Sequence, residues 1–514
     1  MQYLINTRYK KDNLELWYWD ETAKKIVKTV KNDDHSPYLL TDENSFQKLT
    51  DKSLVTKSEV ITKYDPTNFK NVQLLKLCTK HPREIFDKRS KTGLRTLLTN
   101  SWEDNIRYEN CYIIDTKRIF CLPDNFIKEI YTIPNNKLKE FLFNHFMSVV
   151  KYPVFKMPKK ALDIEIYNEN SEIDAKTANL PIISCAIVDN SRKLVYVHRD
   201  YLDESLSFLK LVDSIVTKYK TSKGTTVEYV IRVCNTEYEL HKAIFTELSS
   251  GHFTLYTFNG DEFDLKYIYN RAKKLGFKDE DIPIIIDFNG RRTSCYLRNS
   301  LHIDIQKLFN TGVLSYAYPI ERYPSLNDVA SVIVGETKLE INVFNKVSKQ
   351  LCDYCLNDAL LVYKITEADN ETLPTLITLL SRIYNVSLEQ LSRTSLSRLN
   401  YMLFQYVHRL LNYLIPNKQY FLKKSAELTL PKGKVGQYKG GEVIFSNPGI
   451  YFDVDVYDFT SEYPGVIDSE NLSYETLGCP HEECRKNVIE GHNFHVCTKF
   501  KGVVSALFLS LIHI

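Results

Sequence analysis

The sequence predicts an α/β protein with several domains (α+β multidomain), and three observations favour this class. The chain has 514 residues, which corresponds to three or four domains at roughly 100–200 residues each. Between residues 156 and 368, apolar runs of strand length first form a hairpin and then alternate with helical segments. Residues 370–425 are apolar and helical, with a break at Pro416. This pattern predicts a mixed sheet covered by helices, followed by a helical connection.

The composition is that of an ordinary globular protein, with 43% hydrophobic and 25% charged residues. A net charge of +3 is too small to indicate nucleic-acid binding by itself, so such contacts must come from local patches. Eleven scattered cysteines and an N-terminus broken by charges favour a reduced, cytoplasmic setting. The sequence has no run of the ~20 apolar residues that span a bilayer, so no membrane partner is expected.

The elements can be assigned in order. Residues 1–155 contain β-like runs at Gln2–Asn6, Leu14–Trp19 and Cys111–Ile114, which predicts a mixed N-terminal domain. In the central part we expect strands at 161–167, 181–188, 193–199, 253–258 and 301–309, and helices at 237–248, 264–276, 325–335 and 349–368. Residues 449–464 are predicted to form a β-rich run that ends at Pro464.

Two carboxylates lie two residues apart in the first strand of the central part. Asp163 and Glu165 leave the same face of that strand, while Leu162, Ile164 and Ile166 occupy the other face. Neighbouring carboxylates repel each other unless a cation lies between them, so the pair is a candidate divalent-metal site. A solvent-facing strand edge would explain the same pattern.

Two further acids belong to predicted helices. Asp264 starts a helix within Asn259-x-x-x-Phe263-Asp264, where the helix N-terminus favours an acid in any case. Asp358 lies four residues after Tyr354 on a helix, so a tyrosine hydroxyl can orient a water beside a metal there. Taken singly, a helix-start acid and a surface Tyr/Asp pair are the simpler interpretations.

The three motifs carry more weight together than singly. A strand D-x-E, a strand-to-helix N-x-x-x-F-D and a helical Y-x-x-x-D follow one another over residues 163–358, and a sheet can bring their ends together. Four carboxylates suit two Mg²⁺ or Mn²⁺ ions, because hard cations prefer oxygen ligands. Two such ions would activate a water and stabilise the leaving oxygen of a phosphodiester displacement.

These motifs resemble the three exonuclease motifs of family B DNA polymerases, which are DEDDy 3′→5′ exonucleases with a ribonuclease-H-like fold. The three motifs are matched in order by ALDIEIY, YTFNGDEFDLKYI and YCLNDALLVYKI. The resemblance implies four metal-binding carboxylates: Asp163, Glu165, Asp264 and Asp358. It also implies that Tyr354 aligns the attacking water, and that Asn259 and Phe263 line the path of single-stranded DNA. Asp304, in the strand-like run between the motifs, is not expected to be a ligand.

Two later motifs resemble the start of a family B polymerase palm. Tyr438, Gly440 and Gly441 form a Y-x-G-G element that would contact DNA, although a plain turn explains it equally well. VYDFTSEYPGVI resembles motif A, which implies that Asp458, at the end of an apolar strand, binds both polymerase metals. Phe459 would offer its backbone carbonyl and Ser461 would face the triphosphate. The ring of Tyr463 would stack under the sugar of the nucleotide.

The palm motif departs from the family pattern in two ways. Glu462 and Gly465 replace the usual Leu and Ser, and an acid at 462 should repel a triphosphate unless it points away. A family B polymerase also needs a K-x-x-x-N-S-x-Y-G helix and a D-T-D hairpin, and the sequence contains neither. Because one palm aspartate does not assemble a two-metal site, we expect this chain by itself not to extend DNA. It is similar to an archaeal member, most like the thaumarchaeal branch, truncated after motif A.

Cys479, Cys484 and Cys497 lie close in sequence, and His492 and His495 lie between the last two of them. Thiolates and imidazoles at this density suit Zn²⁺, but the spacing C-x₄-C-x₁₂-C matches no standard zinc finger. In family members from hot habitats, a cysteine pair at this place resembles a disulfide. Three interpretations of the cysteines therefore stay open: inert thiols, ligands of a structural zinc ion, or a disulfide.

Four domains are expected. They are an N-terminal domain of the template- and uracil-sensing type at 1–155, the exonuclease at 156–368, a helical connection at 369–440 and an incomplete palm at 441–514. In the first domain, Pro37 and Tyr38 either belong to a uracil pocket or simply pack in the core. The resemblance implies primer–template DNA, a single-stranded 3′ end, deoxynucleoside triphosphates and a sliding clamp as partners.

The leading function is a DNA-directed DNA polymerase with proofreading exonuclease, of which this chain should be nuclease-competent only. A free-standing DEDDy exonuclease is one alternative, although such an enzyme has no use for DFTSEYP. A non-catalytic DNA-binding replication subunit is another, and it would be favoured if exonuclease acids were missing.

Overall fold

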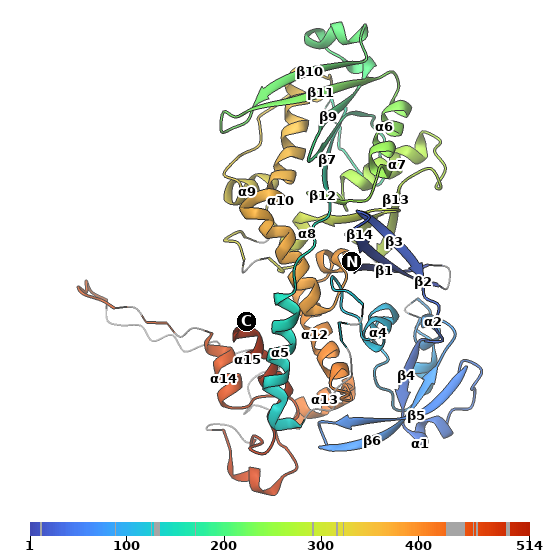
Figure 1. Ribbon diagram of the computed structural model, residues 1–514, viewed down its shortest axis with the longest axis vertical. Coiled ribbons are helices and arrows are strands. Elements are labelled where there is room, and N and C mark those ends of the chain that lie inside the picture. Colours follow the sequence, from blue (N-terminus) through green and yellow to red (C-terminus); the bar gives the residue numbers. More distant parts are fainter. Residues whose placement is uncertain are drawn as a thin grey trace. The chain divides into compact units, whose positions relative to one another are not determined.

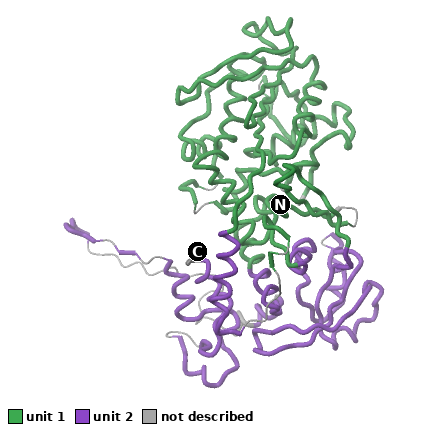
Figure 2. The backbone as a smooth tube through the Cα atoms, in the orientation of Figure 1, with its two compact units in different colours: residues 1–32, 117–127, 152–403 green, residues 33–116, 128–151, 404–514 purple. Residues whose placement is uncertain are grey.

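The computed structural model describes residues 1–10, 13–87, 89–124, 126–127, 134–169, 171–289, 292–314, 317–321, 323–427, 448–455, 457–458, 461–489 and 494–513. The chain divides into two compact units, drawn in green and purple in Figure 2. Unit 1 comprises residues 1–32, 117–127 and 152–403, and unit 2 comprises residues 33–116, 128–151 and 404–514. Each unit is therefore built from separate stretches of the chain.

The centre of unit 1 is a seven-stranded mixed sheet (Figure 1), in the order β10-β11-β9-β8-β7-β12-β15. Its strands are β7 (Lys159–Ile166), β8 (Ile182–Asp189), β9 (Lys193–His198), β10 (Ser214–Lys220), β11 (Thr226–Cys234), β12 (Thr254–Thr257) and β15 (Leu301–Asp304). Strand β8 is antiparallel to β7 and β9, whereas β12 is parallel to β7 and β15. The predicted hairpin and the mixed, ribonuclease-H-like sheet are confirmed.

Helices cover both faces of this sheet because its side chains alternate. On one face Leu162, Ile164 and Ile166 of β7 pack in a core with α6 (Glu237–Ser249) and α7 (Asp264–Lys274). On the other face lies α10 (Lys349–Tyr384), as Figure 1 shows. Each large apolar side chain buried in these two cores contributes roughly 1.5–3 kcal/mol. Residues 163 and 165, between the apolar positions of β7, therefore lie on the α10 side.

Helix α10 bends at 368–371, where Asp369, Asn370 and Glu371 have left-handed φ angles of 49°, 58° and 65°. After the bend the chain continues through α11 (Leu388–Arg393) and α12 (Leu396–Leu410). Helix α12 ends before Pro416 and α13 (Lys418–Glu427) begins after it, so the break predicted at this proline is confirmed.

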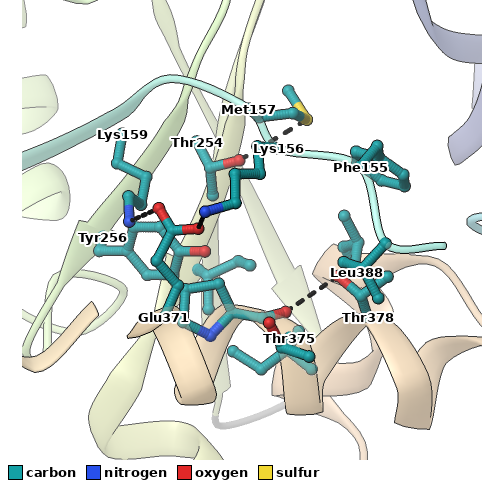
Figure 3. Close-up of a pocket in the computed structure, with 14 residues that line it drawn as sticks. Phe155, Lys156, Met157, Lys159, Thr254, Tyr256, Glu371, Thr375, Thr378 and Leu388 are labelled. Carbon is teal, nitrogen blue, oxygen red and sulfur yellow. Dashed lines mark hydrogen bonds and ion pairs between the residues drawn. The ribbon is translucent and has the colours of Figure 1, made fainter. Parts of the chain in front are cut away.

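A small cavity of about 80 Å³ lies beside the bend of α10 (Figure 3). Lys159 and Lys156 reach into its rim and pair with Glu371 at 2.7 and 2.6 Å. Lys159 also pairs with Glu367. Because these charges neutralise one another, they hold the bend to β7 rather than present a charged surface to a ligand.

Unit 1 also contains an antiparallel sheet of β1 (Gln2–Lys10), β2 (Asn13–Asp20) and β3 (Lys25–Val30), and the hairpin of β13 (Ile284–Asn289) and β14 (Arg292–Leu297). Its short helices are α8 (Ile305–Asn310) and α9 (Leu326–Ile333). The prediction of a helix near 325–335 is confirmed.

Unit 2 combines a three-stranded antiparallel sheet with helices. The sheet has the order β4-β6-β5, with β4 (Tyr38–Thr41), β5 (Lys57–Asp65) and β6 (Lys70–Cys78). The helices are α1 (Glu43–Gln47), α2 (Pro82–Ile85), α3 (Leu94–Leu97), α4 (Tyr108–Asp115), α5 (Leu138–Lys151), α13, α14 (Glu462–Ser469) and α15 (Val503–His513).

Three secondary-structure predictions are wrong in part. Cys111–Ile114 belongs to helix α4, because Tyr108, Cys111 and Tyr112 recur at helical spacing and are all buried. The strand predicted at 301–309 ends at Asp304, whose carboxylate accepts a hydrogen bond from the backbone amide of Lys307 and so caps α8. Short apolar runs are compatible with a strand or a helix, and a capping residue such as Asp304 determines where the helix begins.

The β-rich run predicted at 449–464 is the third error. Its described residues form no strand, and α14 begins at Glu462 within the run. Ile450 and Phe452 are 87% and 85% exposed, and no described strand pairs with them. A strand without a neighbour lacks hydrogen-bond partners for its backbone. Asp458 therefore does not end a strand in this structure.

Candidate metal centre

Strand β7 supplies the first two acids of the site. Asp163 is half-buried and Glu165 is buried, and both lie on the face of β7 that α10 covers. One carboxylate oxygen of each acid and the Cys355 sulfur of α10 lie within 4.8 Å of one another. Strand β7 and helix α10 therefore lie close together at these two acids.

Helix α10 supplies Asp358 and Tyr354, one turn apart. Asp358 is 3% exposed, and its Oδ2 accepts a hydrogen bond from Lys338 Nζ at 2.6 Å. Its Oδ1 is buried and accepts no hydrogen bond from any described residue. A buried carboxylate oxygen without a donor is costly, so this atom has the capacity to bind a cation.

The turn before α7 supplies Asp264. Asp304 at the end of β15 accepts hydrogen bonds from the backbone amides of Asn259 and Asp261, at 3.0 and 3.1 Å. Asn259 has a left-handed φ of 71°, and a Cβ at Gly260 would lie 2.6 Å from the Cβ of Thr257. This tight turn delivers Asp264 to the first position of α7.

Asp264 is buried beside β7, as its interaction with the backbone of Ile164 shows. Phe263, just before it, is half-buried and packs partly against the core under α7, with its ring 6.0 Å from that of Tyr267. Asn259 is also half-buried, so both predicted DNA-contacting side chains keep some surface exposed.

The acids of the site hold their protons more strongly than free acids do. Burial, followed by repulsion from Asp358, Glu165 and Asp264, raises the pKa of Asp163 well above its ordinary value. Burial and the charge of Asp358 likewise raise the pKa of Glu165. Burial raises the pKa of Asp264 to about 7, with smaller contributions from Asp304 and Asp358. These mutual effects place all four carboxylates within electrostatic reach of one another.

A pair of divalent cations fits this set of residues. Hard cations with oxygen ligands would replace the protons, and the orphaned Oδ1 of Asp358 would gain a partner. Cys355 is not a suitable ligand, because burial raises the pKa of its thiol well above the usual value and its sulfur contacts the carbonyl of Asp163.

Sequence reasoning missed Lys338. It lies in the connection between α9 and α10, outside every recognised motif, and its side chain reaches both Asp358 and Tyr354. Burial, with the negative charge of Asp358, raises the pKa of Tyr354 to about 12. A lysine 20 residues before the acid gives no periodic signal, and tertiary structure is needed to see the contact.

The palm residues predicted from the sequence lie in unit 2 or outside the described residues. Asp458, Glu462 and Tyr463 are exposed, and Ser461 begins α14 in a left-handed conformation with φ 58°. Phe459 and the element Tyr438, Gly440 and Gly441 lie outside the described residues. The described part of the palm motif does not assemble a second cluster of acids.

In unit 2, the phenol of Tyr38 is buried in a polar network rather than exposed to a pocket. Its hydroxyl donates to Asp115 Oδ2 at 2.9 Å, and Arg409 contacts the same hydroxyl and pairs with Asp115 at 2.7 Å. His35 completes the network at 2.8 Å from Asp115. Of the two roles considered for Tyr38, this arrangement favours core packing.

The three C-terminal cysteines are brought together in unit 2. Cys479, Cys484 and Cys497 are buried and form no disulfide. The side chain of His481 joins them, with the four ligand atoms within 4.8 Å of one another. His495, which the sequence singled out, instead donates from Nε2 to the carbonyl of Cys479 at 2.9 Å. His492 lies outside the described residues.

Comparisons with known proteins agree with these motifs. Residues 101–315 match the model for the DNA polymerase family B exonuclease domain, and residues 386–506 match that for DNA polymerase family B. DNA polymerase 1 of Saccharolobus solfataricus is 32% identical, over 94% of this chain and 55% of its own length. DNA polymerase 1 of Sulfolobus acidocaldarius is 30% identical, over 98% and 59%. The chain therefore spans somewhat more than half the length of these curated relatives.

A solved structure shares the fold. The family B DNA polymerase from the hyperthermophilic archaeon Pyrobaculum calidifontis aligns with a TM-score of 0.66 at 18% identity, over 100% of this chain and 63% of that one. Among the described residues, every helix is too short or too polar to cross a bilayer. With both family models, archaeal relatives and fold in agreement, the chain belongs to the family B DNA polymerases.

Proposed function

We propose that unit 1 of this chain is a proofreading exonuclease of a DNA-directed DNA polymerase and removes nucleotides from a single-stranded 3′ end. The observation that carries the proposal is a cluster of carboxylates whose pKa values are all raised, chiefly by burial: Asp163, Glu165, Asp264 and Asp358. Membership of the family B DNA polymerases supports DNA as the substrate.

The four carboxylates would hold two Mg²⁺ or Mn²⁺ ions, which supply an activated water and stabilise the leaving oxygen when bound. Asp163 and Glu165 extend from the rigid strand β7, and Asp264 and Asp358 from helices packed on that sheet. Ligands on regular elements keep their spacing better than ligands on loops.

Tyr354 acts as a hydrogen-bond donor rather than as a base. Its pKa of about 12 keeps the phenol protonated at neutral pH. Tyr354 lies one turn from Asp358 on α10, and its hydroxyl would orient the attacking water by donating to the water oxygen. The charge of Lys338 lowers the pKa of Asp358, against the burial that raises it, and the ammonium fixes one of the carboxylate oxygens.

The reaction balances without a further co-reactant. The water oxygen forms a bond to phosphorus while the bond from phosphorus to the O3′ of the penultimate nucleotide breaks. The leaving O3′ takes up a proton, and a nucleoside 5′-monophosphate departs. Asn259 and Phe263, half-buried at the turn before Asp264, would contact the terminal nucleotides.

The palm motif is proposed to serve nucleotidyl transfer with deoxynucleoside triphosphates on a primer–template. Asp458, Ser461 and Tyr463 would contribute from this chain, and the 78% exposed ring of Tyr463 is accessible to a nucleotide. One aspartate does not hold two metal ions, so this chain by itself should trim DNA and not extend it. A sliding clamp belongs to the same proposal, by resemblance to the family.

Digestion of 3′-labelled single-stranded DNA with Mg²⁺ tests the nuclease proposal. The wild type should shorten the strand stepwise, Asp163→Ala/Glu165→Ala should be inactive, and Asp281→Ala, which changes an exposed acid after α7, should match the wild type. Equal inactivity of all three proteins would favour a non-catalytic DNA-binding subunit. Primer extension by the wild type would contradict the incomplete palm.

A further inference from the structure

We propose that Cys479, His481, Cys484 and Cys497 of unit 2 bind one structural Zn²⁺ ion. The four ligand atoms lie within 4.8 Å of one another. The sulfurs of Cys484 and Cys497 are 4.0 Å apart, and the Cys497 sulfur lies 3.4 Å from His481 Nδ1. Ligands of a tetrahedral ion at ~2.3 Å are about 3.8 Å apart. A disulfide would require about 2.05 Å, so the observed spacing suits a shared ion.

The backbone brings these residues together independently of any ion. Cys479 lies before the 3₁₀ helix Glu482–Lys486, and Cys484 lies within it. Cys497 follows His495 and Val496, which form antiparallel β-bridges with Val488 and Leu477. The amide of Gly478 donates to the carbonyl of His495 at 2.8 Å, and that of Cys497 donates to Thr476 at 2.9 Å. The site is therefore largely preformed, which lowers the conformational cost of binding.

Backbone amides point at the sulfurs, as thiolate ligands require. The amide of Thr498 donates to the Cys484 sulfur at 3.4 Å. The amides of Lys499 and Phe500 interact in the same way with Cys497. Hydrogen bonds from outside the ligand set orient the ligands of protein metal sites and tune their charge. Three thiolates and one imidazole select a soft or borderline ion such as Zn²⁺ over Mg²⁺.

His481 completes the set, and His495 does not. The ring of His481 packs against Phe69 and Phe500, at centroid distances of 4.6 and 5.3 Å. His495 is held by the carbonyl of Cys479. Phe69 lies in the turn between β5 and β6, so an ion at this cluster would fasten the 479–497 segment to that turn within unit 2.

Metal analysis of the purified chain tests this site. The chain is produced under reducing conditions with added ZnSO₄, without chelator, and its zinc content is measured by mass spectrometry. We expect one zinc per wild-type chain and at least a tenfold lower content in Cys484→Ser and His481→Ala. The matched controls Cys234→Ser, a buried thiol of unit 1, and His495→Gln should keep the zinc.

A second measurement on the wild type covers the case in which the variants do not fold. Titration with a mercurial thiol reagent, followed with a chromogenic zinc chelator, should release one zinc as three thiols react. A zinc-free wild type, undiminished zinc in Cys484→Ser, or a disulfide among the three cysteines in non-reducing peptide mapping would overturn the proposal. None of these outcomes depends on nuclease activity.

Discussion

The ammonium of Lys338 lies 2.6 Å from Oδ2 of Asp358 and 5.1 Å from the ring centroid of Tyr354. Burial lowers the pKa of Lys338, but the charge of Asp358 outweighs it and leaves the pKa raised, so the side chain stays cationic. One lysine thus links the predicted metal ligand to the predicted water-orienting residue, and it supplies positive charge beside a group of acids.

Removing this lysine should impair hydrolysis. Lys338→Ala leaves Asp358 buried without its cationic partner, and we expect the rate of single-strand trimming to fall roughly 100-fold, as for other preorganised charged donors. Lys338→Arg should recover part of the rate. Lys346→Ala, an exposed lysine on the same connection, is the matched control and should keep full activity. A wild-type rate for Lys338→Ala would contradict the role of this contact.

Removing only the hydroxyl of Tyr354 should separate chemistry from metal binding. Tyr354→Phe keeps the ring, which packs edge-on against Phe344 at 5.9 Å, so the free energy of unfolding should change by less than about 1 kcal/mol. The turnover rate should fall at least roughly tenfold. Isothermal titration with Mn²⁺ should give unchanged affinity, and a weakened Mn²⁺ affinity would show that the hydroxyl acts on the metals instead.

The raised pKa of Asp264 predicts a pH-dependent cost in the absence of metal. Because its folded pKa of about 7 exceeds the ordinary value of 3.8, the favourable contribution is present below pH 3.8 and is lost as pH rises through 7. In EDTA at pH 8, Asp264→Asn should therefore be more stable than the wild type by roughly 1–3 kcal/mol.

Denaturant unfolding at pH 5 and pH 8 measures this difference. The advantage of Asp264→Asn should shrink at pH 5, and saturating Mn²⁺ at pH 8 should reverse the order, because the wild type alone retains the full ligand set. Asp281→Asn should show neither effect. An advantage of equal size at both pH values would point to packing rather than charge.

Unit 2 should lose stability in acid through His408. Burial lowers the pKa of this histidine to about 3, and its ring contacts the Phe404 carbonyl at 2.8 Å and the Tyr474 hydroxyl at 2.6 Å. Its contribution is present above the ordinary pKa of 6.5 and is lost as pH falls toward 3. Between pH 6.5 and 4, the free energy of unfolding should fall more steeply for the wild type than for His408→Gln, and equal slopes would contradict this assignment.

Sequence reasoning recovered those parts of the molecule that local patterns encode. The alternation of Leu162, Ile164 and Ile166 with two acids predicts both the strand β7 and its polar face. The spacing of Tyr354 and Asp358 predicts their shared helix face. Both features follow from the side-chain periods of a strand, two residues, and of a helix, 3.6 residues, and these periods can be recognised in the sequence alone.

Features that depend on contacts between distant segments were out of reach. Lys338 and the role of Asp304 in holding the turn at Asn259 became visible only when β15, α7 and α10 were placed together. The run at 449–464 has the composition of strands, yet pairing partners decide whether a strand forms. His481 was passed over because a histidine between two cysteines has no distinctive spacing.

The most direct test of the central claim is anomalous diffraction from crystals of the wild-type chain soaked in Mn²⁺. The account predicts two anomalous peaks about 3.5–4 Å apart, bound by oxygens of Asp163, Glu165, Asp264 and Asp358, and their loss in Asp163→Ala/Glu165→Ala. Saturating Mn²⁺ with no peak at these four carboxylates would contradict it.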